Sequence, residues 1–346
     1  MNKINTRAKA KTKTKMKKLR PNQKILALSG GVGGAKLALG LTQVLPPEQL
    51  SIVINSADDF EHLGLHISPD IDTHLYALSN RDNQQLGWGR RDETWSFMDS
   101  IGELNDEDWF QLGDRDLALH ILRTQRLKQG QNLSGITHSF AESFGIKHAL
   151  IPMSDDPVRT MIKTGSTEDQ PKHEYMPFQR YFVQHQCQPV VTGFHFEGVE
   201  TATASKQFMA HLADPALAAV IICPSNPYVS IDPILALPDV RIALIESPAK
   251  VIAISPIVGG AAIKGPAAKM MKELNVPVNP AAVAAHYGEL LDGFVIDQLD
   301  STHEKQISST GLPVLVTDTM MIDIDIKQLL AQKIIDFALS LTSSND

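Results

Sequence analysis

The sequence predicts an α/β fold, in which a mostly parallel sheet carries helices on both faces. Short apolar runs of strand length recur along the chain, and segments with helical spacing lie between them. Such alternation is typical of βαβ units, whose crossover helices cover both faces of a parallel sheet. In addition, glycine-rich or polar loops follow several of the apolar runs. In a parallel sheet these loops gather at the carboxyl ends of the strands, where ligands bind.

The apolar runs and the helical segments can be assigned in chain order. Seven runs are expected to be strands: Lys24–Leu28, Ser51–Asn55, His148–Pro152, Ala218–Cys223, Val251–Ser255, Phe294–Asp297 and Val314–Thr317. Four segments show the spacing of helices that bury one face: Ala35–Val44, Ala267–Leu274, Val283–Leu291 and Ile326–Leu341. The stretch 170–189, which contains proline and is then rich in Phe, Tyr and Gln, is expected to lead to edge strands.

One long stretch departs from this alternation. Residues 92–147 read as several helices without a convincing strand, beginning near Trp95 and including Asp114–Lys128 and Ser134–Phe144. We therefore expect a helical insertion after the second strand. The predicted organisation is a disordered basic tail at 1–23, the first part of the core at 24–91, the helical insertion at 92–147 and the rest of the α/β core at 148–346.

Composition excludes several classes of protein. The chain has 346 residues, of which 43% are hydrophobic and 21% charged, as is ordinary for a globular protein. Its longest apolar run is eight residues, far below the roughly 20 that span a membrane. Two cysteines are too few for a disulfide scaffold, and we expect a reducing, cytoplasmic location. The net charge is −7, although residues 1–24 hold ten Lys or Arg. The rest of the chain is therefore strongly acidic, and we do not expect it to bind nucleic acid.

The first strand runs into a loop that contains four glycines within residues 30–34. Gly31, Gly33 and Gly34 allow the backbone to approach a ligand closely, and the N-terminus of the following helix favours an anion. Lys36 stands where the third glycine of a dinucleotide fingerprint belongs, and no Gly-Lys-Ser/Thr of a P-loop is present. The segment therefore predicts a phosphate or nucleotide loop, with a tight turn that binds nothing as the alternative.

Four aspartates form the most informative group. Asp58 and Asp59 follow the second strand, and Asp70 and Asp72 come about a dozen residues later, before Thr73. Carboxylates gathered at neighbouring loops repel each other unless a cation lies between them, and Mg²⁺ prefers such hard oxygen ligands. The pattern favours a magnesium site. The structural alternative is that Asp70 or Asp72 caps a helix starting at Thr73 and that Asp58 closes a turn.

Further loops contribute polar groups to the same predicted site. Asp114 is expected to cap the helix that follows it, whereas Arg115 could meet an anion. Ser225 and Asn226 follow the strand Ala218–Cys223, and an Asn side chain offers both a donor and an acceptor to a base or ribose. After the strand Val251–Ser255, Gly259 and Gly260 provide flexible backbone and Lys264 provides one positive charge. No His-Glu-x-x-His or Gly-x-Ser-x-Gly motif is present.

Taken in order, these loops resemble the 2-phospho-L-lactate transferase family of deazaflavin coenzyme biosynthesis. The resemblance covers about residues 24–340, and its most specific segments are Gly87-Trp88-Gly89, Gly113-Asp114-Arg115-Asp116 and Ser255-Pro256-Ile257-Val258-Gly259-Gly260. It implies a Rossmann-like core with an added helical region, a requirement for Mg²⁺ and a homodimer. The basic tail is the main departure from the family core.

The resemblance also implies a reaction. A guanosine diphosphate-linked hydroxy acid would donate a phospho-hydroxyacid to the ribityl hydroxyl of the deazaflavin Fo, releasing GMP and forming coenzyme F-420-0 or an analogue. The acid would be lactate, enolpyruvate or glycerate. The glycine loop would hold the diphosphate, and Ser225 and Asn226 the guanosine. Trp88, Arg91 and Trp95 would meet the flat deazaflavin, with helix packing as their structural alternative.

Within that picture, Asp58, Asp59, Asp70 and Asp72 would hold Mg²⁺, and one of them would act as the general base; their spacing does not separate the two roles. A related family of non-catalytic, nucleotide-sugar-binding regulatory proteins is the alternative, because it shares the glycine loop. An NAD(P)-dependent oxidoreductase fits less well, because the third glycine is missing and Asn55, rather than an acid, ends the second strand.

Overall fold

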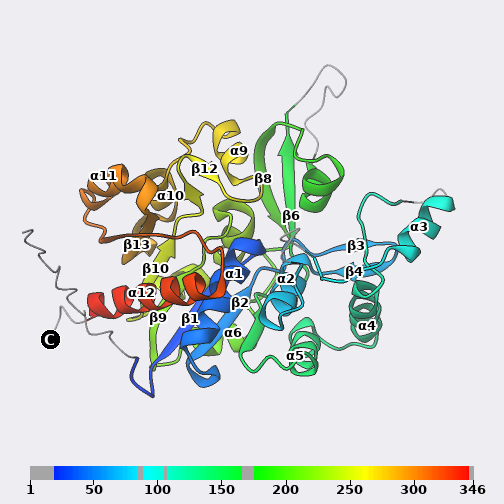
Figure 1. Ribbon diagram of the computed structural model, residues 1–346, viewed down its shortest axis with the longest axis horizontal. Coiled ribbons are helices and arrows are strands. Elements are labelled where there is room, and N and C mark those ends of the chain that lie inside the picture. The colour runs from blue at the N-terminus through cyan, green and yellow to red at the C-terminus, as the bar shows by residue number, and fades with distance from the viewer. Residues whose placement is uncertain (1–18, 84–88, 105–106, 166–174, 343–346) are drawn as a thin grey trace, which may run out of the picture.

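The computed structural model describes residues 19–83, 89–104, 107–165 and 175–342, and its centre is a seven-stranded parallel sheet. All seven expected strands form it. They are β1 (Lys24–Ser29), β2 (Leu50–Ile54), β5 (Ala149–Pro152), β9 (Leu217–Ile222), β10 (Lys250–Ile254), β13 (Gly293–Asp297) and β14 (Val314–Thr317). The expected fold class, an α/β Rossmann-like sheet covered on both faces, is confirmed (Figure 1).

The order of the strands fixes where a ligand crevice lies. The sheet runs β14-β13-β10-β9-β1-β2-β5, so the chain builds outward from β1 on one side and then from β9 on the other. This reversal places the topological switch point between β1 and β9. Ser29 pairs with Ile54 and Leu28 with Ile222, so the three central strands end at nearly the same level. The loops that follow them are therefore neighbours.

Two hydrophobic cores lie on opposite faces of the sheet. Alternate residues of β1 point to each, with Leu26 and Leu28 in one core and Ile25 and Ala27 in the other. The second core is closed by α1 (Gly31–Val44), α2 (Pro69–Leu78), α5 (Leu133–Ser143) and α12 (Ile324–Thr342), of which α12 lies across β9, β10 and β13 (Figure 1). The first core is closed by α6 (Lys206–Leu212), α8 (Val240–Glu246), α9 (Ala267–Glu273) and α10 (Pro280–Tyr287).

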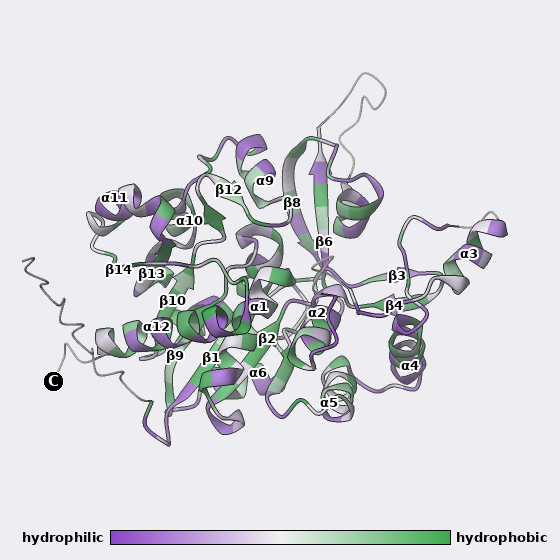
Figure 2. Cartoon of the chain, viewed as in Figure 1, coloured by the Kyte–Doolittle hydropathy of each residue, from purple (hydrophilic) through white to green (hydrophobic). Residues whose placement is uncertain are grey.

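The hydropathy colouring agrees with this layering. Figure 2 shows the central strands in green and the outer helices in alternating green and purple, as expected for helices that bury one face. Among the described residues no helix is both long and apolar enough to cross a bilayer. Short helices complete the cover: α7 (Asp232–Leu235), α11 (Glu304–Ser308), the 3-10 helices η1 (Pro47–Gln49), η4 (Gly288–Leu290) and η5 (Gln298–His303), and the π-helices η2 (Arg180–Gln184) and η3 (Pro227–Ile231).

Three small sheets were not predicted. The hairpin of β3 (Phe60–His62) and β4 (Leu65–Ile67) directly follows the Asp58-Asp59 loop. A second hairpin pairs β11 (Ile257–Val258) with β12 (Ala261–Ala262). The third sheet is antiparallel and contains β6 (Arg159–Thr164), β7 (Tyr175–Pro177) and β8 (Val191–Glu197). The stretch 170–189, expected to lead to edge strands, contains β7 and is followed by β8, and these two are the edge strands of this sheet.

The segment 92–147 is helical, as predicted, wherever the structure describes regular elements in it. Its helices are α3 (Ser96–Glu103), α4 (Asp116–Lys128) and α5, and the described residues of 92–147 contain no strand. In Figure 1, α3 and the β3–β4 hairpin extend away from the parallel sheet, with α4 beside them. The hairpin contacts α4, so it links the carboxyl edge of the sheet to these helices.

Candidate functional site

The glycine loop lies at the switch point, between β1 and α1, and its glycines serve two purposes. A Cβ at Gly33 would lie 2.3 Å from the carbonyl oxygen of Pro224, and one at Gly34 would lie 2.3 Å from the Ser29 hydroxyl. These two glycines are required because the loop after β9 packs against the start of α1. Gly31 has φ +62° and no atom near its missing Cβ. Gly31 is therefore the position where the backbone faces open space at the helix N-terminus.

Ser225 and Asn226 hold this arrangement together. The backbone N–H of Gly30 donates to the Ser225 hydroxyl at 3.1 Å, and that hydroxyl donates to the carbonyl of Gly30 at 2.8 Å. Asn226 accepts from the backbone N–H of Tyr228 at 3.0 Å and so caps η3. Both side chains thus have partners within the protein. Their predicted contact with guanosine stays a prediction.

A buried asparagine that the sequence analysis did not assign to the site joins three of its loops. The Asn55 side-chain amide donates to Asp70 Oδ2 at 3.1 Å and to the carbonyl of Val229 at 3.3 Å, and its oxygen accepts from the N–H of Ala57. A Cβ at Gly30 would lie within 3.3 Å of Asn55, Asp70 and Ser230. The loops after β1 and β2, the start of α2 and η3 therefore converge, as predicted for the carboxyl edge of the sheet.

The four predicted aspartates are all buried, but they have different partners. Asp58 Oδ1 and Asp59 Oδ1 are buried without a hydrogen-bond partner among the described residues. Asp59 Oδ2 accepts from Ser68 at 2.7 Å and from His66 at 2.9 Å. Asp70 is held by Asn55, whereas both oxygens of Asp72 accept from the buried guanidinium of Arg123. The helix-capping alternative is wrong, because α2 begins at Pro69 and contains both Asp70 and Asp72 in its first turn.

The electrostatics of this group favour a cation. Burial raises the pKa of Asp58 well above its ordinary value, and the nearby Asp70 carboxylate raises it further. Burial also raises the pKa of Asp70 to about 6, although hydrogen bonds from Asn55 and the Gly31 backbone oppose the rise. Desolvation and mutual repulsion both disfavour the charged forms. A bound cation would remove that cost.

The donor set fits Mg²⁺. No group of three or more His, Cys, Asp or Glu side chains suited to hold a metal occurs in the part of the chain that the structure describes. Mg²⁺ does not need one, because it is usually held by one or two carboxylates, waters and substrate phosphates. Among the four aspartates, Asp58 and Asp59 each have a buried oxygen, Oδ1, with no hydrogen-bond partner in the described part of the chain. They are the residues that would hold Mg²⁺ in this structure.

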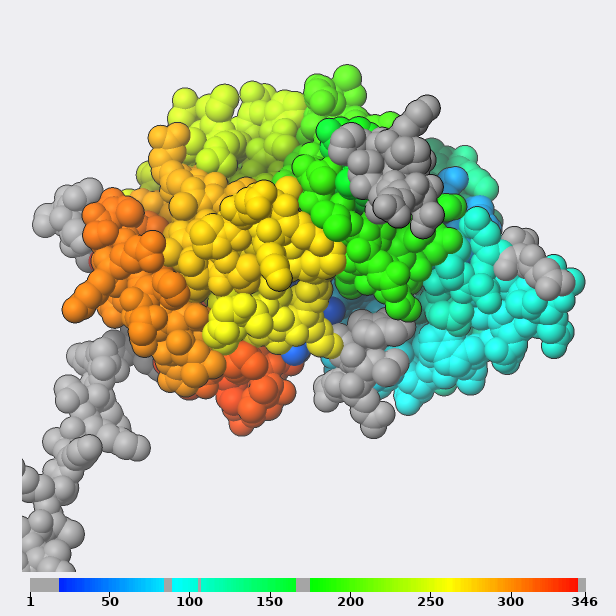
Figure 3. Space-filling model, turned by 90° about the horizontal axis from the view of Figure 1, so that it is seen from above, coloured from blue at the N-terminus to red at the C-terminus, as the bar shows by residue number. Residues whose placement is uncertain are grey.

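Positive charge approaches the glycine loop from the other side. Burial lowers the pKa of Lys36 on α1, and Lys264 and Lys327 lower it further by repulsion. Lys36 and Lys264, which were predicted separately as parts of two loops, thus lie near enough to interact, with Lys327 of α12 as an additional cation. Gly259 and Gly260 form the tight turn of the β11–β12 hairpin, and the N–H of Gly259 donates to Asp300. In Figure 3, a small blue area from the first part of the chain is visible between the yellow, green and cyan parts.

The predicted residues of the helical segment have local partners. Asp114 accepts hydrogen bonds from Thr94, Ser96 and Phe97 and so caps α3. The prediction that Asp114 caps the helix following it was wrong, because that helix, α4, begins at Asp116 and has no side-chain cap. The exposed Arg91 lies 3.9 Å from Asp92. Trp95 is half-buried at the start of α3, and the N–H of Arg115 donates to Glu93. Trp88 lies outside the described residues. The predicted contact of these side chains with a deazaflavin stays a prediction.

An aromatic cluster beside Asp59 was also missed. Phe60, His62, Trp109 and Phe110 pack edge to face or tilted, with ring centroids 4.9–6.4 Å apart. In the sequence, Phe60 and the adjacent pair Trp109-Phe110 lie in different segments. Only the folding of the β3–β4 hairpin onto the segment before α4 brings them together.

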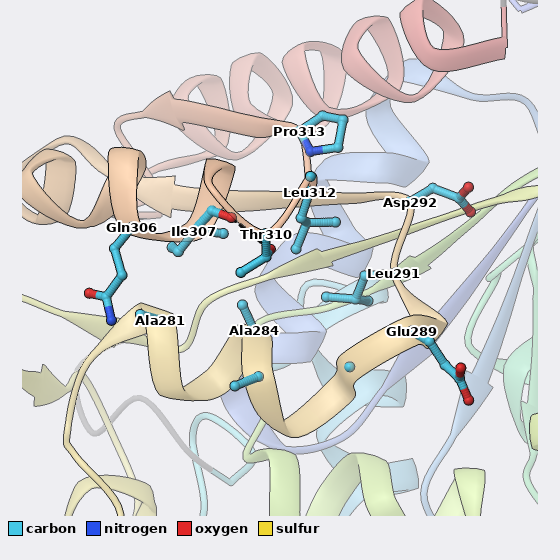
Figure 4. A pocket seen from close by; sticks show the side chains of 13 residues that line it. Ala281, Ala284, Glu289, Leu291, Asp292, Gln306, Ile307, Thr310, Leu312 and Pro313 are labelled. Carbon is cyan, nitrogen blue, oxygen red and sulfur yellow. Dashed lines mark hydrogen bonds between the residues drawn. The ribbon is translucent and has the colours of Figure 1, made fainter.

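A cavity also occurs away from these loops. It has a volume of about 600 Å³ and is lined by residues of α10, η4 and α11 and by the segment before β14 (Figure 4). Asp292 precedes β13 and Pro313 precedes β14, so this cavity lies at the amino ends of the strands, opposite the loops described above. It contains none of the predicted site residues.

Comparisons with known proteins place the whole chain in context. A family model described as 2-phospho-L-lactate transferase CofD matches residues 25–335. A 2-phospho-L-lactate transferase from Methanosarcina acetivorans is 37% identical over 311 residues, covering 90% of this chain and 98% of the relative. A phosphoenolpyruvate transferase from Streptomyces griseus is 34% identical over 317 residues, covering 91% and 98%. A crystal structure of a UPF0052 family member from Bacillus halodurans shares the fold, with a TM-score of 0.58, 13% identity and coverage of 90% and 98%.

Proposed function

Because this chain belongs to the 2-phospho-L-lactate transferase family, we propose that it transfers a phospho-hydroxyacid from a guanosine diphosphate-linked donor to the ribityl hydroxyl of the deazaflavin Fo. GMP leaves, and the product is coenzyme F-420-0 or an analogue. The relatives named above carry the names of both phospholactate and phosphoenolpyruvate transferases, so the acid is 2-phospholactate or a close analogue such as phosphoenolpyruvate or 3-phosphoglycerate. As in the family, we expect a cytoplasmic homodimer.

The observation that carries this proposal is the pair of buried Oδ1 atoms of Asp58 and Asp59, which have no partner among the described residues and lie on the loop after β2. Phosphoryl transfer needs positioning and charge neutralisation more than covalent help from the protein. Mg²⁺ held by these two carboxylates would neutralise the diphosphate and stabilise the leaving phosphate. Gly31 and Lys36 would hold the same diphosphate from the helix side.

A side chain of the protein would accept the proton of the attacking ribityl hydroxyl. In the transfer, the ribityl hydroxyl oxygen forms a bond to the phosphorus that carries the hydroxy acid, and the bond from that phosphorus to the GMP oxygen breaks. The hydroxyl proton must leave. Asp70 is suited to accept it, because burial raises its pKa to about 6, close to neutral pH. Asp72 is not assigned this role, since both of its oxygens are bound to Arg123.

The deazaflavin would lie toward the helical segment. The aromatic cluster of Phe60, His62, Trp109 and Phe110 begins one residue after Asp59, and Trp109 and Phe110 are only half-buried. Aromatic side chains of this kind provide faces and edges against which a flat ring can pack. Trp95 and Arg91 precede Trp109 by fewer than 20 residues in the sequence and are proposed to contact the same ring.

The test is a transfer assay with purified protein. Fo and Mg²⁺ are incubated with the lactate, enolpyruvate and glycerate forms of the donor, and GMP and the deazaflavin product are measured by chromatography. We expect one donor to be preferred and turnover to stop when the metal is chelated. Asp58→Asn and Asp59→Asn should each lower turnover by at least about 100-fold. Asp214→Asn, which alters an acid paired with Lys24 at the amino edge of the sheet, is the matched control.

Two outcomes would overturn the proposal. Undiminished GMP release in both site variants would remove the metal assignment. Tight binding of a UDP-sugar with no change in deazaflavin fluorescence would instead support a non-catalytic nucleotide-sugar-binding protein.

A further inference from the structure

Asp59 presents its two carboxylate oxygens very differently. Oδ2 accepts two hydrogen bonds, from the Ser68 hydroxyl at 2.7 Å and from His66 Nε2 at 2.9 Å. Oδ1 is buried and has no partner among the described residues. One oxygen is therefore occupied on the protein side, and only the other is left for a ligand.

The two donors are themselves held in place. The backbone N–H of His66, on β4, donates to the Thr124 hydroxyl at 2.7 Å. Ser68 is fully buried just before α2, and its carbonyl accepts from the N–H of Asp72 at 2.9 Å. The donors thus come from the β3–β4 hairpin and from the start of α2, and their positions are set by α4 and by α2 itself. Rotating Asp59 to offer both oxygens would break two hydrogen bonds to a buried carboxylate.

We propose that His66 and Ser68 are positioning residues that restrict Asp59 to one-oxygen coordination and so make the site select Mg²⁺ over Ca²⁺. Mg²⁺ requires a compact octahedral shell and binds carboxylates through single oxygens, whereas Ca²⁺ takes about six to eight oxygens and readily accepts both oxygens of one carboxylate. Fixing Oδ2 on the protein removes the geometry that Ca²⁺ favours. This inference rests on the magnesium site of the proposed function.

A purely structural role for the same hydrogen bonds predicts something different. If His66 and Ser68 only fasten the hairpin and α2 to the loop after β2, their loss should weaken the binding of both metals together. A selectivity role predicts that the ratio of the two affinities changes. The ratio is therefore the quantity to measure.

The experiment titrates Mg²⁺ alone and Ca²⁺ alone into the full-length protein by isothermal titration calorimetry, without substrates. Ser68→Ala removes one donor to Oδ2, and Ser68→Thr keeps the hydroxyl. Residues that orient a metal ligand typically contribute about 10- to 100-fold to metal affinity. We expect Ser68→Ala to weaken Mg²⁺ binding by about 10-fold while Ca²⁺ binding is unchanged or tighter, and Ser68→Thr to restore the wild-type ratio.

Ser205→Ala is the matched control, because Ser205 is equally a buried serine but its hydroxyl makes no hydrogen bond within the described residues. Its two affinities should equal those of the wild type. If circular dichroism shows that Ser68→Ala is unfolded, His66→Leu replaces it, since His66 is partly exposed and its loss removes the other donor. The same shift in ratio is then expected.

The outcomes separate the two levels of the argument. Equal weakening of both metals without rescue by Ser68→Thr would overturn the selectivity role while leaving the metal site intact. If the wild-type protein binds no Mg²⁺ in this titration or in a repeat with GDP present to supply phosphates, the proposed magnesium site itself is overturned.

Discussion

The pair formed by Asp72 and Arg123 allows a sharp test of how this site is built. Asp72 lies in the first turn of α2 and Arg123 in α4, and the exposed fractions of their side chains are 8% and 1%. Burial raises the pKa of Asp72, and the adjacent guanidinium opposes that rise. We predict that Asp72→Asn destabilises the protein severely, because it leaves the charge of Arg123 buried and unpaired.

The expected magnitude follows from the burial of both partners. Removing one member of a buried ion pair costs about 3–5 kcal/mol, which is a large part of the roughly 5–15 kcal/mol that stabilises a typical domain. Replacing both partners by uncharged residues of similar size removes the unpaired charge. The double variant Asp72→Asn with Arg123→Met should therefore recover about 2 kcal/mol relative to the sum of the single changes.

Urea denaturation followed by circular dichroism measures these free energies. Asp70→Asn serves as the matched control, since Asp70 occupies the same turn of α2 but has a hydrogen bond from neutral Asn55 in place of a cation. Its loss of charge should cost little or increase stability. An unfolding free energy for Asp72→Asn within about 0.5 kcal/mol of wild type, the ordinary range of surface substitutions, would refute the reasoning.

Three further predictions concern the surroundings of the site. Gly33→Ala should prevent stable folding, because its Cβ would lie 2.3 Å from the Pro224 carbonyl oxygen. Gly31→Ala should fold at a cost of about 1–2 kcal/mol but bind the donor poorly. Comparing the expression, melting temperature and nucleotide affinity of the two variants checks both expectations. Burial raises the pKa of Asp116 to about 7, so between about pH 4 and 7 the folded state holds a proton at this carboxyl that the unfolded state has lost, and the contribution of Asp116 to stability falls across that window. Asp116→Asn should therefore gain stability relative to wild type as the pH rises, and a pH-independent difference in urea titrations would contradict this. His74 is buried, which lowers its pKa to about 4, and its Nδ1–H donates to the carbonyl of Asp70. Its ¹⁵N NMR signals should therefore show a neutral ring protonated at Nδ1 at pH 6. A charged ring at that pH would contradict this protonation state.

Much of the fold could be predicted because its signals are local. All seven strands of the parallel sheet were identified from short apolar runs, since burial on both faces leaves such runs in the sequence. The helices of the inserted segment were likewise visible from their spacing. The small hairpins were not; β3 and β4, for example, are only three residues each. Three residues are too few to establish an alternating pattern.

The sequence by itself determined that glycine and aspartate loops lie at the carboxyl edge of a parallel sheet, since that follows from their positions after predicted strands. Only the tertiary structure decided what each side chain meets. Asp72 is separated from Arg123 by 51 residues, and Asn55 from Val229 by 174. Such partners are set by how α4 and η3 pack against the start of α2 and the end of β2. A linear pattern carries the periodicity of one element, whereas a buried carboxylate is satisfied by groups from several elements at once.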